Sequence, residues 1–132
     1  MDIDLADCPD LGPVLIALGC LCGGTTVIRN AGRLRIKESD RIASMQQELA
    51  KMGGQVQVDG DTLTMTGGAL HAPAEPLSGH NDHRIVMALT VAALAAGVPA
   101  TIRGAEAVRK SWPDFFEVMR SLGAHIDLVE SE

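Results

Sequence analysis

Aromatic residues are nearly absent from this chain, which has one Trp, two Phe and no Tyr among 132 residues. Surfaces that bind single-stranded nucleic acid need aromatic side chains on which the bases stack, interleaved with basic residues. Acidic residues also outnumber basic ones, and the formal net charge of −6 disfavours a polyanionic partner. We therefore expect no nucleic-acid partner.

Cysteine is scarce too, with three residues in all, and none is spaced with His as in a zinc site. We interpret them as free thiols of a reducing compartment and expect no metal site. The longest apolar run, residues 85–96, is too short to span a bilayer. The acidic start of the sequence is unlike a basic secretory signal. These features predict a cytoplasmic protein with no membrane partner.

What the chain does have is enough apolar sequence for one packed domain, with 46% hydrophobic and 21% charged residues. Alternation, apolar periodicity and Gly or Pro punctuation predict a strand, an apolar helix, a strand, an amphipathic helix and a hairpin. In that order these segments are residues 2–7, 14–22, 25–28, 39–52 and 55–65. A helix as apolar as 14–22 belongs in a core.

The second half of the chain repeats this pattern. It predicts an apolar helix, a strand, an amphipathic helix and a closing strand, at residues 83–96, 99–102, 112–122 and 124–129. Ile28-Arg29 recurs as Ile102-Arg103, which sets the offset at 74 residues, from 28 to 102. We therefore predict two repeats, about 2–67 and 74–130, in an α/β (α+β) fold. Because both apolar helices need covering on all sides, we expect a further unit or partner surface.

Charged residues gather where the predicted helices begin. Lys37, Glu38 and Arg41 surround the first turn of the helix at 39–52, where free backbone N–H groups attract a phosphate or carboxylate. Glu38 among these cations is a candidate for proton transfer. The alternative is a solvated, charge-balanced helix start.

Other helix starts carry similar groups. His83 and Arg84 open the second apolar helix, where Arg84 either binds an anion bidentately or extends its head group to water. Asp10 precedes the first apolar helix and is either an N-cap or a site carboxylate. Lys110 precedes the last helix. Because equivalent ends of repeats point the same way, we expect these groups to converge into an anion site with acid and base groups.

Three motifs follow one another along the chain: Lys37-Glu38-Ser39-Asp40-Arg41, Asn81-Asp82-His83-Arg84 and Lys110-Ser111-Trp112-Pro113. In this order they resemble the signatures of the C-terminal part of the EPSP synthase family, the 3-phosphoshikimate 1-carboxyvinyltransferases of the shikimate pathway. The resemblance covers essentially the whole chain. It implies repeated βαβαββ units with buried apolar helices, forming a partial domain of a longer, two-domain enzyme whose N-terminal domain is missing here.

The resemblance also implies roles for the matching residues. Arg41, Arg84 and Lys110 would bind phosphoenolpyruvate, with His83 as a neighbour. Glu38 would move the proton at the methylene carbon, Asp10 would take the proton of the shikimate 3-phosphate hydroxyl, and Lys37 would lie beside that hydroxyl. No metal or organic cofactor is implied. The family's serine-rich phosphate site belongs to the other domain.

A non-catalytic interpretation remains open from the residues themselves. Basic helix starts on a repeat-built module could hold a generic phosphate or anion without any reaction. Further repeats upstream and a Ser-Ser phosphate site would distinguish the enzyme from such a module.

Overall fold

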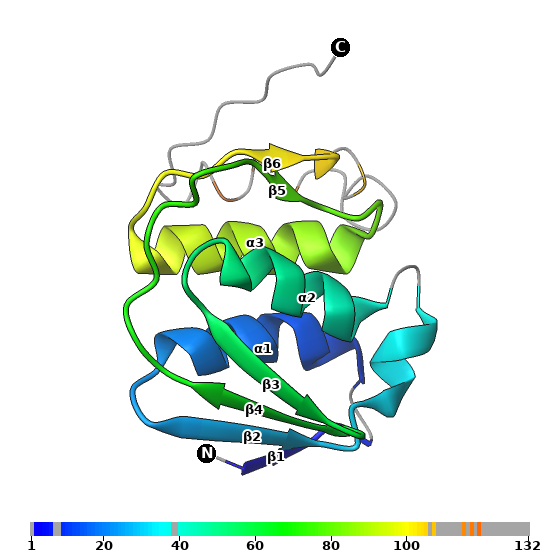
Figure 1. Cartoon of the computed structure of the whole chain (residues 1–132). Helices are drawn as coiled ribbons and strands as arrows, with labels where there is room; N and C mark the ends of the chain where they lie inside the picture. Colours follow the sequence, from blue (N-terminus) through cyan, green and yellow to red (C-terminus); the bar gives the residue numbers. More distant parts are fainter. Residues whose placement is uncertain are drawn as a thin grey trace.

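The computed structural model describes residues 2–6, 9–37 and 40–105, together with residues 107, 115, 117 and 119. The larger of its two sheets contains four strands in the order β1-β2-β4-β3 (Figure 1). They are β1 (Asp2–Asp4), β2 (Thr25–Arg29), β3 (Gln55–Asp59) and β4 (Thr62–Thr66). β1 is parallel to β2, whereas β4 is antiparallel to both of its neighbours.

Three helices lie between this sheet and a second, two-stranded sheet (Figure 1). The helices are α1 (Gly12–Leu21), α2 (Arg41–Ala50) and α3 (His83–Ala96), and the small sheet pairs β5 (Leu77–Ser78) with β6 (Ile102–Arg103). Two short 3-10 helices, η1 (Pro9–Leu11) and η2 (Gly32–Ile36), precede α1 and α2. The placement of helices between sheets explains why α1 and α3 are so apolar.

Local chemistry sets the bounds of the helices. The Asp40 carboxylate accepts a hydrogen bond from the Ala43 amide and caps α2, and Asp82 caps α3 in the same way. Gly97 ends α3 in the left-handed conformation, with φ of 68°. The amphipathic face of α2 buries Met45 and Leu49 completely, as its periodicity predicted.

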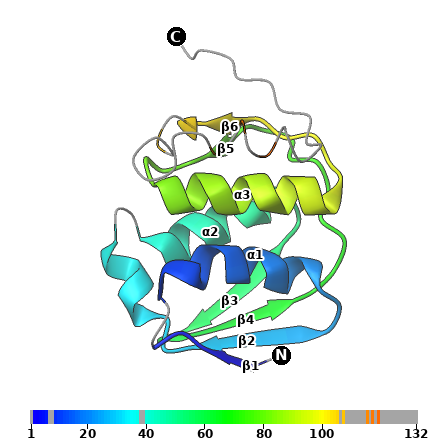
Figure 2. The same ribbon diagram turned by 180° about the vertical axis from the view of Figure 1, so that it is seen from behind.

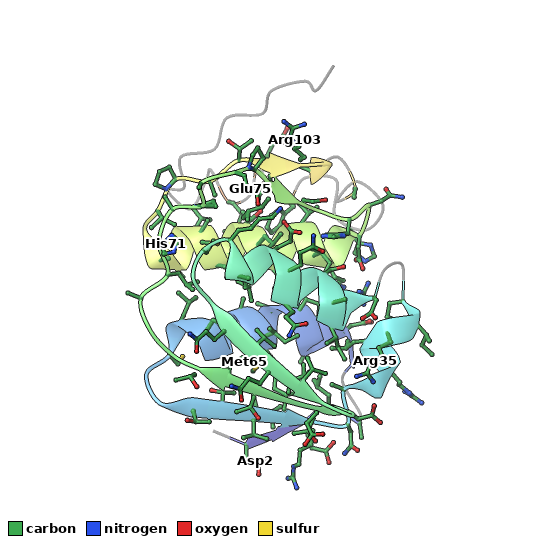
Figure 3. All side chains as sticks on the ribbon, viewed as in Figure 1. Asp2, Arg35, Met65, His71, Glu75 and Arg103 are labelled. Carbon is green, nitrogen blue, oxygen red and sulfur yellow. The ribbon has the colours of Figure 1, made fainter. Side chains whose placement is uncertain are left out.

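The core lies between the helices and the large sheet. Ile16 of α1, Leu89 of α3 and Met65 of β4 are all fully buried there. Figure 3 shows Met65 directed from the sheet toward the helices, and a Cβ on Gly19 of α1 would lie 2.7 Å from its methyl group. The expectation that both apolar helices belong in a core is confirmed.

The two parallel strand pairs have the same spacing along the chain. Ile3 is opposite Ile28 in one pair, and Leu77 is opposite Ile102 in the other, so that each strand pairs with residues 25 positions later. The Leu5 amide, which follows β1, donates to the Arg29 carbonyl. In the same way the Gly79 amide, which follows β5, donates to the Arg103 carbonyl. The repeated units therefore share their opening geometry, while the boundaries 2–67 and 74–130 stay predictions.

Several predicted bounds differ from the structure. β1 ends at Asp4 rather than at residue 7, and β6 covers Ile102–Arg103 rather than 99–102. η2 was not predicted, because a short 3-10 helix has no apolar periodicity. The predicted helix 112–122 falls largely, and the strand 124–129 wholly, outside the described residues. In the described ranges, no helix has the length and apolar character needed to cross a membrane.

Candidate functional site

The three helices begin on the same side of the molecule, as Figures 1 and 2 show from opposite directions. η1, η2 and the segment after β5 lead into these helix starts. Each of these connections carries charged residues that the sequence had singled out. The predicted convergence of equivalent helix starts is therefore present for α1, α2 and α3.

Arg41, the first residue of α2, is the centre of this cluster. Its side chain is only 2% exposed, and the Asp82 carboxylate at the start of α3 is fully buried. Arg41 Nε donates to Asp82 Oδ2 at 2.8 Å, and Nη2 donates to Asp82 Oδ1 at 3.1 Å. This bidentate ion pair joins the N-terminal ends of α2 and α3 and neutralises two charges that burial would otherwise make costly.

Asp10, in η1, adds a second carboxylate to the same guanidinium. Its Oδ1 accepts from Arg41 Nη1 at 3.3 Å and lies 4.0 Å from Lys37 Nζ. Unlike Asp82, the Asp10 side chain is 58% exposed. The alternative that Asp10 caps α1 is wrong, because Leu11 occupies the cap position and no side chain caps that helix. Asp10 is thus an accessible carboxylate between two cations.

The start of α3 places His83 and Arg84 beside this cluster. The Asp82 carboxylate accepts from the Arg84 amide at 3.0 Å, so that the residue which pairs with Arg41 also caps the helix. His83 and Arg84 are both half-buried. Within the described residues, the Arg84 guanidinium has no carboxylate within ion-pair distance.

The other two predicted site residues, Glu38 and Lys110, lie outside the described residues. Lys37 and Asp40 are the described residues on either side of positions 38 and 39. The structure thus brings together Asp10, Lys37, Arg41 and the start of α3, while the roles of all predicted site residues stay predictions.

Sequence reasoning missed two features of this region. It considered Asp82 as a cap but not as the partner of Arg41, which lies 41 positions away. It also overlooked Glu48, a fully buried acid on α2. The signal for Glu48 was its position seven residues after Arg41, which places both side chains on the same face of the helix as the apolar residues.

Glu48 remains ionised because of its partners. Burial raises the pKa of the carboxyl, but the hydrogen bonds from Lys51, His80 and the Ser78 amide, with the Lys51 charge, outweigh it. The pKa of Glu48 consequently lies below its ordinary value of 4.5. Lys51 Nζ, the Ser78 amide and His80 Nε2 each lie 2.8 Å from a Glu48 oxygen.

The described residues offer no metal-ligand cluster, and one cavity among them is uncharged. The described residues contain no group of three His, Cys, Asp or Glu side chains placed to hold a metal ion. A cavity of about 180 Å³ is lined by residues 53–55 and 66–70 with Cys20, and none of these residues carries a charge. The charged helix starts therefore remain the candidate site.

Comparison with known proteins points to one family. The model of EPSP synthase (3-phosphoshikimate 1-carboxyvinyltransferase) matches residues 1–119. The chain is 44% identical over 127 residues to 3-phosphoshikimate 1-carboxyvinyltransferase of Halobacterium salinarum, covering 96% of this chain and 30% of that protein. The Clostridium kluyveri protein of the same name is 48% identical over 130 residues, covering 95% and 29%.

Solved structures agree with the sequence relatives. An EPSP synthase from Acinetobacter baumannii superposes with a TM-score of 0.78 at 27% identity, covering 90% of this chain and 28% of that one. The enolpyruvyl transferase NikO from Streptomyces tendae gives a TM-score of 0.72 at 26% identity, covering 94% and 28%. The predicted fold, repeated units around buried apolar helices in a partial enolpyruvyl transferase domain, is confirmed.

This chain spans about 30% of the length of the curated relatives that it matches. The match nevertheless covers most of the chain itself and includes the Lys37–Arg41 and Asp82–Arg84 helix starts. On this evidence the chain belongs to the EPSP synthase family.

Proposed function

We propose that this chain is the C-terminal part of an enolpyruvyl transferase that moves the carboxyvinyl group of phosphoenolpyruvate to shikimate 3-phosphate. The names of its relatives support the reaction. The observation that carries the proposal is the cluster at the helix starts, in which Lys37, Asp10 and Arg41 are linked to Asp82 and hence to the α3 start. Anion-binding cations and an accessible carboxylate meet there, as this reaction requires.

Arg84 is the cation of the described site best placed to bind a substrate anion. Arg41 already donates three of its N–H groups to Asp82 and Asp10. These carboxylates, its partners among the described residues, offset part of its charge, so an approaching phosphate or carboxylate must compete with them for the guanidinium. We therefore assign anion binding to Arg84, Arg41 and Lys110, with the Arg84 contribution depending least on rearrangement.

The acid and base groups follow from the family resemblance. Glu38 protonates the methylene carbon of phosphoenolpyruvate, and Asp10 accepts the proton of the attacking hydroxyl, which Lys37 orients. The hydroxyl adds to the resulting cationic carbon. The tetrahedral adduct then loses phosphate together with one proton of its methyl group, which Glu38 takes back, so that the carboxyvinyl double bond forms again. His83 borders the site. The position of Lys37 next to Asp10 supports a shared role at the hydroxyl.

The proposal requires a partner domain. The N-terminal domain of the same enzyme would supply the remaining contacts to both substrates and exclude water from the site. We infer that the isolated chain has no measurable transferase activity, because a site open to water loses most of its electrostatic stabilisation. We place the enzyme in the cytoplasm and assign it no cofactor.

The competing proposal is a non-catalytic module that holds a phosphate at its basic helix starts. Glu38→Gln in the complete enzyme separates the two. If Glu38 moves the proton, turnover falls by roughly 10²–10⁴, the usual effect of removing a positioned acid or base. Phosphoenolpyruvate binding stays intact or tightens, since a negative charge has left a cationic site. If Glu38 is only a counter-charge, turnover stays within about tenfold of wild type.

The decisive measurement is hydrogen exchange from heavy water into the methylene group of phosphoenolpyruvate during turnover, followed by NMR. Glu75→Gln is the matched control, because it makes the same chemical change at an exposed position on the segment before β5 (Figure 3). Exchange at the wild-type rate in Glu38→Gln would contradict the catalytic assignment. Failure of the complete enzyme to turn over either substrate would favour the binding module.

A further inference from the structure

Glu48 has no part in the chemistry proposed above, yet it is a fully buried acid with three hydrogen-bond donors. Its Oε1 accepts from the Ser78 amide and from Lys51 Nζ, and its Oε2 lies 2.8 Å from His80 Nε2. An ionised carboxylate only accepts hydrogen bonds, so His80 donates through Nε2. Glu48 therefore connects the last turn of α2 to Ser78, at the end of β5, and to His80, in the segment between β5 and α3.

That segment is held by α2 at two points. Arg41, at the start of the helix, binds Asp82 at the end of the segment, and Glu48, two turns later, binds Ser78 and His80 nearer its beginning. The direction of donation is reversed at the two points, since Arg41 donates and Glu48 accepts. This reversal favours one register of residues 78–82 against α2. A shifted segment would bring its donors toward the Arg41 donors, or its acceptors toward the Glu48 carboxylate.

Between the two points the backbone makes an unusual turn. His80 and Asn81 both have φ of 52°, and the Asp82 amide donates to the Gly79 carbonyl at 2.9 Å. Two consecutive positive φ values are those of a type I′ turn, in which Gly, Asn and Asp are the usual residues, so that His80 is the less common of the two here. Such a conformation persists only when the surrounding structure holds it. The Glu48–His80 bond restrains the side chain of one of these two residues.

We propose that Glu48 and His80 are positioning residues, whose hydrogen bond holds the turn at 79–82 and so fixes the start of α3 that carries Asp82 and Arg84. This inference rests on the proposed binding of a substrate anion by Arg84. Its geometric part concerns the turn alone and is tested in the 132-residue chain without substrate.

The first test compares amide hydrogen exchange in wild type, His80→Ala, Glu48→Gln and Glu48→Ala. The reporters are the Asp82 amide, which closes the turn, and the Val86 amide, which makes the first α3 bond to the Asp82 carbonyl. We expect His80→Ala and Glu48→Ala to reduce their protection by at least about tenfold relative to amides of the β2–β4 ladder. Glu48→Gln keeps an acceptor for the Ser78 amide, so its reporter amides should lose less protection from exchange.

Leu63→Val is the matched control for lost stability, because Leu63 is buried in β4 and pairs with Ile28 rather than with this segment. It should lower protection in the ladder and in α3 together. Equal loss at the reporters and the ladder in His80→Ala and in the milder Glu48→Gln would overturn the positioning role.

The second test is steady-state kinetics of the complete enzyme. A displaced Arg84 should raise the KM for phosphoenolpyruvate about tenfold in His80→Ala while kcat changes less than about threefold. If the reporter amides exchange faster in His80→Ala while the KM for phosphoenolpyruvate is unchanged, the inference that the turn at 79–82 positions Arg84 is wrong. A wild-type enzyme without turnover would contradict the proposed function instead, and the amide measurements would still decide whether the pair positions the turn.

Discussion

The buried Arg41–Asp82 pair allows a substitution that separates charge pairing from helix capping. Asp82 performs both tasks, since it binds Arg41 through two oxygens and accepts from the Arg84 amide. Asn is as good an N-cap as Asp. Asp82→Asn therefore removes the negative charge while the cap remains, and any large loss of stability comes from the ion pair.

The expected loss follows from the burial of both partners. Arg41 is 2% exposed and Asp82 is fully buried, and removing one partner of a buried pair costs about 3–5 kcal/mol. The Asn carbonyl keeps one acceptor for Arg41, and Asp10 still faces Nη1. We therefore expect a loss near the lower limit, about 3 kcal/mol in the free energy of unfolding.

The assay is urea denaturation of the 132-residue chain at neutral pH. The slope of the unfolding free energy against urea concentration should be the same in all variants, so that midpoints can be compared. Asp40→Asn is the matched control, because Asp40 caps α2 with an exposed side chain, and we expect it to change stability by less than about 0.5 kcal/mol. Should Asp82→Asn unfold the chain, Arg41→Met combined with it removes the guanidinium that has lost its buried carboxylate and should recover much of the stability.

The reasoning would be refuted by Asp82→Asn losing no more stability than Asp40→Asn. It would be refuted equally by a double variant that is less stable than Asp82→Asn alone. Either result would mean that the buried guanidinium does not depend on Asp82 for compensation.

Three further predictions concern the site, acid stability and thiol access. In the complete enzyme, Arg84→Lys should weaken phosphoenolpyruvate binding by about 1–3 kcal/mol, because a point charge replaces a bidentate fork; unchanged affinity in titrations with shikimate 3-phosphate present would remove Arg84 from the site. The lowered pKa of Glu48 stabilises the fold above about pH 4.5, and this contribution disappears as pH falls through the lower pKa of the folded state. Between pH 6 and pH 3 the urea midpoint should therefore fall less steeply in Glu48→Gln than in the wild type. Parallel curves of midpoint against pH for the two proteins would contradict this. Cys22 is exposed, whereas Cys20 is buried and burial raises the pKa of its thiol. Iodoacetamide labelling followed by peptide mass spectrometry should therefore modify Cys22 first and Cys20 only on unfolding. Equal labelling of both thiols in the native chain would contradict the burial of Cys20.

Much of the fold could be predicted from local signals. Asp40 and Asp82 precede apolar periodic segments, and both cap helices in the structure. The 74-residue offset between Ile28 and Ile102 predicted a repeated unit, and in the structure both residues pair with strands 25 positions earlier. These features depend on interactions within a few residues or on period alone, so sequence is sufficient for them.

The sequence by itself determined that charged residues lie at helix starts and that those starts belong on one side. Only the tertiary structure decided which of these charges neutralise one another: Arg41 pairs with Asp82 and Asp10, and Glu48 is buried against Ser78 and His80. The partners are 30 to 41 positions apart, and their contact depends on how α2 packs against the segment entering α3. Periodicity assigns a residue to a helix face, but the packing of that face against another element selects its partner.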